Sequence, residues 1–182
     1  MAKPNLTASP KPLAVLAGPP GSGKSTVGAE LAAQLHVDFR DTDADIETST
    51  GRQIGDIFIE SGEAHFRDLE VAAVRTALAE HVGILALGGG AIMEPDTRKV
   101  LGSHLVVFLD VGLAPAMARL EMNRSRPLLL GNVRAQWQHL ADQRRPWYQE
   151  VADITVLTDG RSIDDIVASI VEQLPLTSRK SP

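Results

Sequence analysis

Residues 13–26 read LAVLAGPPGSGKST, a short apolar run that leads directly into a glycine-rich segment. The apolar part has no polar alternation, which predicts a strand that is buried on both faces. After the glycines, Val27, Leu31 and Leu35 recur at helical spacing, and this predicts a helix that ends near His36. A buried strand, a glycine-rich turn and a helix therefore follow one another in the order that a phosphate-binding loop requires.

The turn itself, GPPGSGKS at 18–25, matches the pattern G-x-x-x-x-G-K-[ST]. Its glycines let backbone N–H groups turn toward phosphate oxygens, and the helix N-terminus adds a positive end. We expect Lys24 to reach the β and γ phosphates and the Ser25 hydroxyl to bind Mg²⁺. The residues expected to contact ATP or GTP here are Gly21, Ser22, Gly23, Lys24, Ser25 and Thr26. The pattern alone does not separate a kinase from a switch or a motor.

The rest of the chain alternates short apolar runs with segments of helical periodicity. Further strands are predicted at 37–40, 84–87, 105–110 and 154–157. A helical pattern covers 52–81 with a break near Ser61 and Gly62, and another covers 163–174. The prediction is a three-layer α/β domain with a five-stranded parallel sheet flanked by helices, and such a sheet binds ligands at the carboxyl ends of its strands.

Composition narrows the class of protein. The 182 residues contain no cysteine, which excludes disulfides and metal sites made of thiols. The net charge of −5 argues against nucleic acid as the main partner. No run approaches the ~20 apolar residues of a membrane span, and nothing points to an obligate partner. We expect a monomeric cytoplasmic protein with a single domain at 12–176, a disordered extension at 1–11 and a tail at 177–182.

Arginine is concentrated in one region of this acidic chain. Residues 119–145 hold six arginines against two acidic residues, which suggests binding of a small anion. The alternative is a helix face whose arginines point to water. Within this region, NRSRPLLLGN at 123–132 suits a flap, or lid, over about 120–134 that closes on nucleotide and brings an arginine to the transferred phosphoryl group. The three leucines of this stretch could instead belong to the core, but Gly131 and the polar flanks favour a surface flap.

Two segments are candidates for binding a phosphate acceptor. In DTDAD at 41–45, Asp41 and Asp43 would face the same way in an extended chain, so Asp41 could bind Mg²⁺ through water and Asp43 could act as base. They could instead only cap the next helix. In SGEAHFRDLE, Arg67 could hold a substrate carboxylate, or it could pair with Asp68 or Glu70 on its own helix.

A separate glycine-rich segment is LALGGGAIM at 85–93, in which three glycines follow a predicted strand. At the carboxyl end of the sheet, Gly88, Gly89 and Gly90 would allow a ligand to approach bare backbone. Their N–H groups could then donate to a substrate hydroxyl or carboxylate, or to a γ-phosphate oxygen.

Taken together, GPPGSGKST, DTD, SGEAHFRDLE, LALGGGA and RPLL resemble shikimate kinase in order and spacing from about residue 12 to 175. The resemblance implies a P-loop fold of the nucleoside monophosphate kinase type, with a shikimate-binding region at about 41–70. It implies ATP and Mg²⁺ as cofactors and the 3-hydroxyl of shikimate as acceptor. Gluconate, a nucleoside monophosphate or an aminated shikimate are alternative acceptors, and a nucleotide-dependent regulator without acceptor chemistry is an alternative of another class.

The resemblance also assigns roles residue by residue. It implies that Asp43 holds the shikimate hydroxyls, with Asp41 near Mg²⁺, and that Gly88–Gly90 line the shikimate site. Other implied contacts are Arg67 and Arg144 on the shikimate carboxylate, Arg126 of the lid on the phosphates, Arg119 near adenine, and Phe58 and Phe66 as walls of the pocket. Arg145 adjoins Arg144, but the spacing to Pro146 and Tyr148 favours Arg144.

Overall fold

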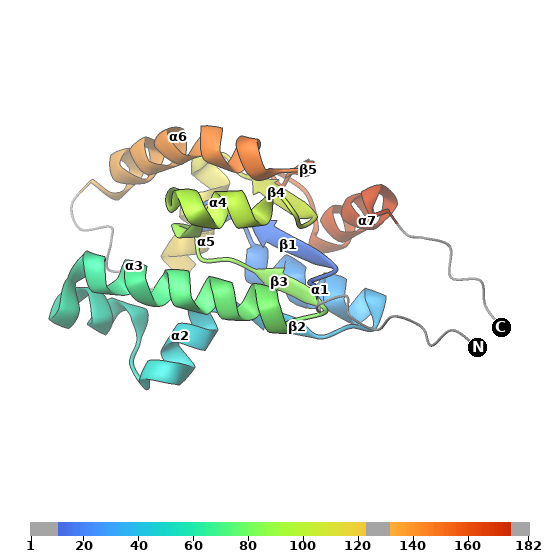
Figure 1. Cartoon of the computed structure of the whole chain (residues 1–182). Coiled ribbons are helices and arrows are strands. Elements are labelled where there is room, and N and C mark those ends of the chain that lie inside the picture. The colour runs from blue at the N-terminus through green and yellow to red at the C-terminus, as the bar shows by residue number, and fades with distance from the viewer. Residues whose placement is uncertain (1–10, 123–131, 176–182) are drawn as a thin grey trace, which may run out of the picture.

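The structure, a computed structural model, describes residues 11–122 and 132–175, and its centre is a parallel sheet (Figure 1). The sheet has five strands in the order β2-β3-β1-β4-β5, and each neighbouring pair is parallel. The strands are β1 (Ala14–Ala17), β2 (Phe39–Asp41), β3 (Ile84–Ala86), β4 (Val106–Asp110) and β5 (Ile154–Leu157). The predicted five-stranded parallel sheet is confirmed, although β2 begins two residues later than predicted.

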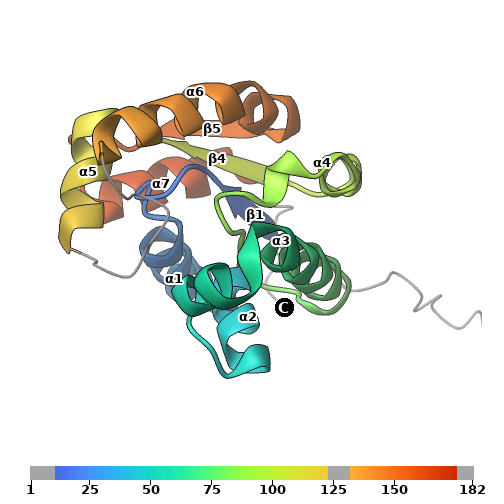
Figure 2. The ribbon, with the colours of Figure 1, turned by 90° about the vertical axis from the view of Figure 1, so that its left-hand side faces the viewer.

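Helices cover both faces of this sheet, and Figure 2 shows α1 and α7 on the side opposite to α3 and α4. The α-helices are α1 (Lys24–Leu35), α2 (Thr42–Thr50), α3 (Ile54–Glu80), α4 (Pro95–Leu101), α5 (Leu113–Met122), α6 (Val133–Val151) and α7 (Ile163–Gln173). A short 3-10 helix, η1 (Ala91–Met93), follows β3. The three-layer α/β prediction is therefore confirmed. None of the helices in the described ranges is long and apolar enough to cross a membrane.

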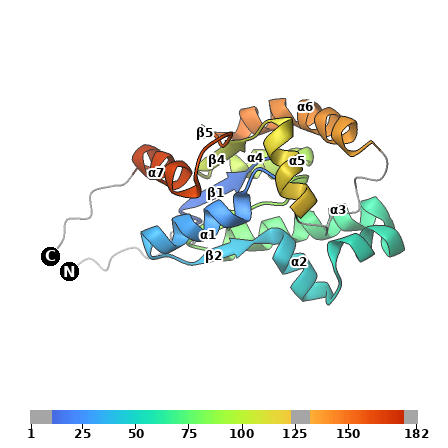
Figure 3. The same ribbon diagram turned by 180° about the vertical axis from the view of Figure 1, so that it is seen from behind.

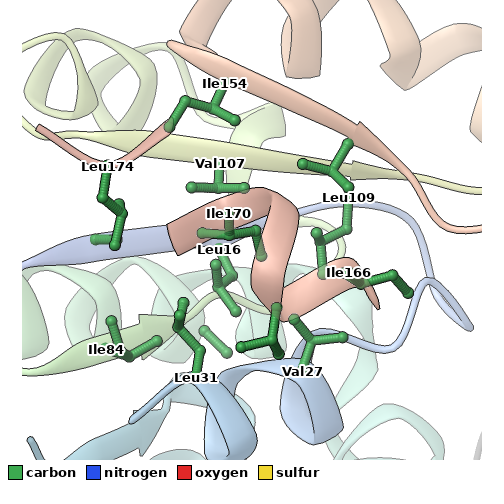
Figure 4. Packing of buried hydrophobic residues seen from close by; sticks show 14 of the residues in the cluster. Leu16, Val27, Leu31, Ile84, Val107, Leu109, Ile154, Ile166, Ile170 and Leu174 are labelled. Atoms are coloured by element: carbon green, nitrogen blue, oxygen red, sulfur yellow. The ribbon is translucent and has the colours of Figure 1, made fainter. Parts of the chain in front are cut away.

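Each face of the sheet has its own apolar core, because successive strand residues point to opposite faces. Leu16 of β1 packs with Leu31 of α1 and Ile170 of α7 on one face (Figure 4). Val15 packs on the other face with Val74 of α3 and with residues of α4 and α6. Burial on both faces of the sheet thus explains why the strand sequences are apolar throughout, without alternating polar residues.

A kink divides α3 at Gly62, which has φ 82° and ψ 167°, a conformation open essentially to glycine alone. The break predicted near Ser61 and Gly62 is confirmed. The turns of α3 on both sides of the kink pack with α2 in a small separate cluster that contains Ile46, Ile57 and Phe66. Figure 3 shows these two segments at the end of the molecule opposite to α7.

We expect the α7 face of the core to be a major source of stability. Ile170 is fully buried between α1 and the sheet, so Ile170→Ala should lower the free energy of unfolding by about 2–5 kcal/mol through lost burial and a cavity. Ile59→Ala, which truncates a side chain that is 76% exposed, is the matched control and should change it by less than about 0.5 kcal/mol. Equal losses in urea titrations of the two variants would contradict this assignment of the core.

Candidate active site

The glycine-rich loop between β1 and α1 has the backbone shape that a phosphate cradle needs. Gly21 and Gly23 have φ values of 80° and 91°, and a Cβ on Gly21 would lie 2.8 Å from the carbonyl oxygen of Ala116 on α5. A side chain is therefore excluded at Gly21, and Gly23, whose positive φ favours glycine, directly precedes the first turn of α1. The loop opens on a cavity of about 250 Å³ lined by Gly21, Gly23, Lys24, Ser25, Thr26, Asp41, Asp43, Leu87, Arg119 and Leu120.

Two cations lie against this loop. The buried Lys24 ammonium donates hydrogen bonds to the carbonyl oxygens of Gly18 (2.7 Å) and Pro19 (3.1 Å). Arg119 of α5 donates through Nη1 to the Gly21 carbonyl at 3.0 Å and to Thr158 Oγ1, beyond β5, at 3.3 Å. The positive charge therefore lies where phosphate charge is expected, and Arg119 connects the loop to the segment after β5.

Oxygen donors suitable for a hard cation converge beside the loop. The Ser25 hydroxyl donates to Asp41 Oδ2 at 2.6 Å, so the two predicted metal contacts are adjacent. Mg²⁺ prefers oxygen ligands and is commonly held by one or two protein groups together with substrate phosphates and water. The donor set of Ser25 and Asp41 fits that mode of binding.

The structure corrects the expected conformation around Asp43. Asp41 is the N-cap of α2, and its Oδ1 accepts a hydrogen bond from the Asp43 N–H at 2.9 Å. Asp43 thus lies in the first helical turn, and the prediction that both aspartates project from an extended chain is wrong. The cause is the capping bond, which starts the helix at Thr42. The Asp43 carboxylate nevertheless reaches the second glycine-rich segment, the glycine loop at 88–90 after β3, since a Cβ on Gly88 would lie 2.5 Å from its Oδ1.

Arg67 belongs to a charged cluster on α3. Its guanidinium forms ion pairs with Glu70 at 2.6 Å and with Glu63 at 3.0 Å. Of the two partners on its own helix that the sequence suggested, Asp68 and Glu70, the structure therefore shows Glu70. Glu70 is only 3% exposed, and burial raises the pKa of its carboxyl, although the charge of Arg67 acts in the opposite direction. The negative charge of Asp43 adds to the rise in this pKa. The Arg67 guanidinium also occupies the space that a Cβ on Gly90 would need.

The neighbouring arginines of α6 point to different places. Arg144 is buried and donates through Nη1 to the Gly89 carbonyl at 3.2 Å. Arg145 instead binds Asp110 at the end of β4, with Nη1 2.5 Å from Oδ2. Arg144, the residue favoured by spacing, is therefore the one at the glycine loop.

The three glycines make a surface that is largely filled by the protein itself. The Gly88 N–H donates to Thr42 Oγ1 at 3.0 Å, so the expectation that this N–H serves a ligand is not met in the structure. The Gly89 carbonyl accepts bonds from Arg144 and from the Tyr148 hydroxyl, the latter at 2.6 Å. The missing side chains allow Asp43 and Arg67 to approach the backbone.

Sequence reasoning assigns no role to several residues that position this site. Glu70 enters it only as a rival partner of Arg67, and Thr42, Tyr148 and Trp137 receive no function. All four are buried and polar or amphipathic, and three of them bond to a loop that follows a strand. An acidic residue three positions after an arginine is the only local signal among them. Arg126 and most of the predicted lid lie outside the described residues.

The fold and site define the class of protein. A phosphate-binding loop with its lysine and serine faces a glycine-lined site that holds a carboxylate and two arginines, which is the arrangement of a P-loop kinase with a small anionic acceptor.

Comparison with known proteins identifies the family. Residues 20–175 match the family model described as shikimate kinase. A shikimate kinase of Salinispora tropica is 52% identical over 164 residues, which cover 90% of this chain and 98% of the relative, and one of Streptomyces coelicolor is 50% identical over 91% and 96%. The solved structure of the shikimate kinase from Acinetobacter baumannii in complex with shikimate superposes with a TM-score of 0.85 at 34% identity, over 90% of this chain and 92% of that one. The chain belongs to the shikimate kinase family and is a kinase.

We expect Glu70 to hold Arg67 in place for substrate. Glu70→Gln removes the buried charge next to Arg67 and should raise the KM for shikimate about tenfold, because bonds between charged groups contribute about 1.5–3 kcal/mol. Glu63→Gln is the control, because it changes an exposed partner of the same arginine and should have little effect. Steady-state kinetics measures both; equal KM values for the two variants would contradict the role of Glu70.

The same residue gives a pH signature. Because the pKa of Glu70 is raised, its carboxyl should take up a proton, on acidification, at a higher pH than an ordinary glutamate. Arg67 then loses its buried charged partner and keeps only the exposed Glu63, so the KM of the wild type for shikimate should rise over that pH range and the KM of Glu70→Gln should not.

Proposed function

We propose that this enzyme transfers the γ-phosphoryl group of ATP to the 3-hydroxyl of shikimate, giving shikimate 3-phosphate and ADP on the route to chorismate and the aromatic amino acids. The observation that carries the proposal is the convergence of Asp43, Arg67 and Arg144 on Gly88–Gly90, beside the phosphate-binding loop. The Acinetobacter baumannii relative was solved in complex with shikimate, which supports the choice of acceptor.

The donor side of the proposal is the glycine-rich loop. Residues 21–26 would hold the ATP phosphates through backbone N–H groups, with Lys24 supplying positive charge and Arg119 lying on the nucleotide side. Ser25 and Asp41 would hold Mg²⁺, which when bound neutralises charge on the phosphates. Lys24 must exchange the Gly18 and Pro19 carbonyls for phosphate oxygens as ATP enters.

The acceptor side matches shikimate, which carries one carboxylate and three hydroxyls. Arg67 and Arg144 would bind the carboxylate, since guanidinium groups hold carboxylates through paired hydrogen bonds. Asp43 would accept the proton of the attacking hydroxyl, and the glycines at 88–90 let the ring lie close to the backbone. Phe58 and Phe66, whose ring centroids are 4.5 Å apart, would form the apolar wall.

Some parts of the proposal rest on the sequence. Arg126, in the RPLL segment outside the described residues, is proposed to stabilise charge on the transferred group. A monomeric, cytoplasmic enzyme that binds neither nucleic acid nor membranes, with its kinase domain at 12–176, remains a prediction.

We expect ADP release that depends on shikimate. In a coupled assay with Mg²⁺-ATP, the wild type should respond to shikimate more strongly than to quinate or gluconate. Arg67→Lys should raise the KM for shikimate at least about tenfold and leave the KM for ATP nearly unchanged, because lysine keeps the charge but cannot form the paired bonds of the guanidinium.

Two variants serve as controls in this assay. Arg75→Lys changes an exposed arginine of the same helix, whose ion pair with Asp96 is 3.6 Å long, and should leave both constants unchanged. Lys24→Ala should give the background rate. Wild-type ADP release that is insensitive to shikimate would contradict the proposed function, as would a preference for gluconate.

A further inference from the structure

One face of α6 contacts both loops of the site. Trp137, Arg144 and Tyr148 are buried and lie at positions i, i+7 and i+11, which places them along the same side of a helix. Arg144 and Tyr148 bind the Gly89 carbonyl of the glycine loop at 88–90, which we call the acceptor loop. Trp137 instead reaches the phosphate-binding loop at 18–25, which we call the donor loop.

Trp137 forms this contact through its indole N–H, which donates to the Pro20 carbonyl oxygen at 2.9 Å. The ring packs with Val111, Ala116 and Met117 in a small cluster beneath α5. Packing alone would be satisfied by another large apolar ring. The N–H is different, because a buried donor needs an acceptor and this one is a carbonyl of the phosphate-binding loop.

The two loops that α6 holds also touch each other. A Cβ on Gly89 would lie 3.1 Å from Pro20 Cδ and 3.4 Å from Pro20 N, so the donor loop packs on the backbone of the acceptor loop. Trp137 holds Pro20 from one end of the α6 face, and Arg144 holds Gly89 from farther along it. The helix therefore fixes the position of one loop relative to the other.

We propose that Trp137 is a positioning residue for phosphoryl transfer, whose indole N–H fixes the phosphate-binding loop against the acceptor loop. The inference rests on the proposed function, because it concerns the relative placement of ATP and shikimate. Transfer depends on the alignment of the attacking oxygen with the γ-phosphorus, and small displacements of either substrate slow it strongly. Binding of shikimate alone would depend on Arg67, Arg144 and Asp43, whereas the indole N–H of Trp137 donates to Pro20 of the phosphate-binding loop.

Trp137→Phe tests this role because it keeps an aromatic ring and removes only the donor and part of the ring. We expect kcat to fall about tenfold, the equivalent of one hydrogen bond of about 1.4 kcal/mol, while the KM for shikimate stays within about twofold. Trp147→Phe is the matched control on the same helix. Trp147 is half-buried against Arg98, and its replacement should leave kcat within about twofold.

Fluorescence provides a second measurement that does not alter Trp137. The chain has two tryptophans, so Trp147→Phe leaves Trp137 as the sole reporter. A non-hydrolysable ATP analogue with Mg²⁺ should change the emission of this variant, because its indole is bonded to the loop that receives the phosphates. The emission of Trp137→Phe should not respond.

The results separate the two proposals. A folded Trp137→Phe enzyme with a wild-type kcat overturns the role of Trp137. If that variant does not fold, unchanged emission of Trp147→Phe at saturating analogue overturns it. A wild type without shikimate-dependent activity contradicts the proposed function instead, and the fluorescence response still tests the link between Trp137 and the loop.

Discussion

The site depends on one constraint, the common direction of the strands at the centre of the sheet. Because β2, β3 and β1 are adjacent and parallel, the segments that follow them leave the sheet at the same edge. The register pairs both Leu16 and Asp41 with Ala86, so the donor loop, the acceptor loop and the start of α2 begin at one level. The Leu87 N–H continues this pairing by donating to the Leu16 carbonyl at 3.0 Å. Donor and acceptor groups are thus brought together by backbone pairing.

Within that frame, charge is arranged for an anionic acceptor. Glu70 is buried next to Arg67, and the charges of Asp43 and Arg144 also act on the pKa of its carboxyl. Two carboxylates and two guanidinium groups therefore lie close together at the glycine loop at 88–90. A buried carboxylate without a partner would be costly, and the pairing therefore holds Arg67 in one orientation before substrate arrives. The kink at Gly62 bends α3 so that Ile57 before it and Phe66 after it both pack with α2, while Val74, farther along the helix, packs in the core of the sheet.

The parts of this arrangement that can be predicted from the sequence are those with local causes. The phosphate-binding loop, the five strands, the break at Gly62 and the last helix each follow from spacing or from a glycine within a short window. The conformation around Asp43 is predicted wrongly because one capping bond from Asp41 decides between strand and helix. The contact of Trp137 with Pro20 joins residues 117 positions apart, and no local pattern indicates it. The hydrogen bond from the Gly88 N–H to Thr42 joins residues 46 positions apart, and no local pattern indicates it either.

If the shared edge of the sheet holds ATP and shikimate in position for direct transfer, both ligands should be visible there together. The decisive experiment is a crystal structure of the enzyme with Mg²⁺, a non-hydrolysable ATP analogue and shikimate. We predict that the shikimate carboxylate lies within hydrogen-bonding distance of Arg67 and Arg144, and that its 3-hydroxyl lies between Asp43 and the γ-phosphate. A carboxylate bound away from both arginines, or a 3-hydroxyl directed away from Asp43, would contradict this placement.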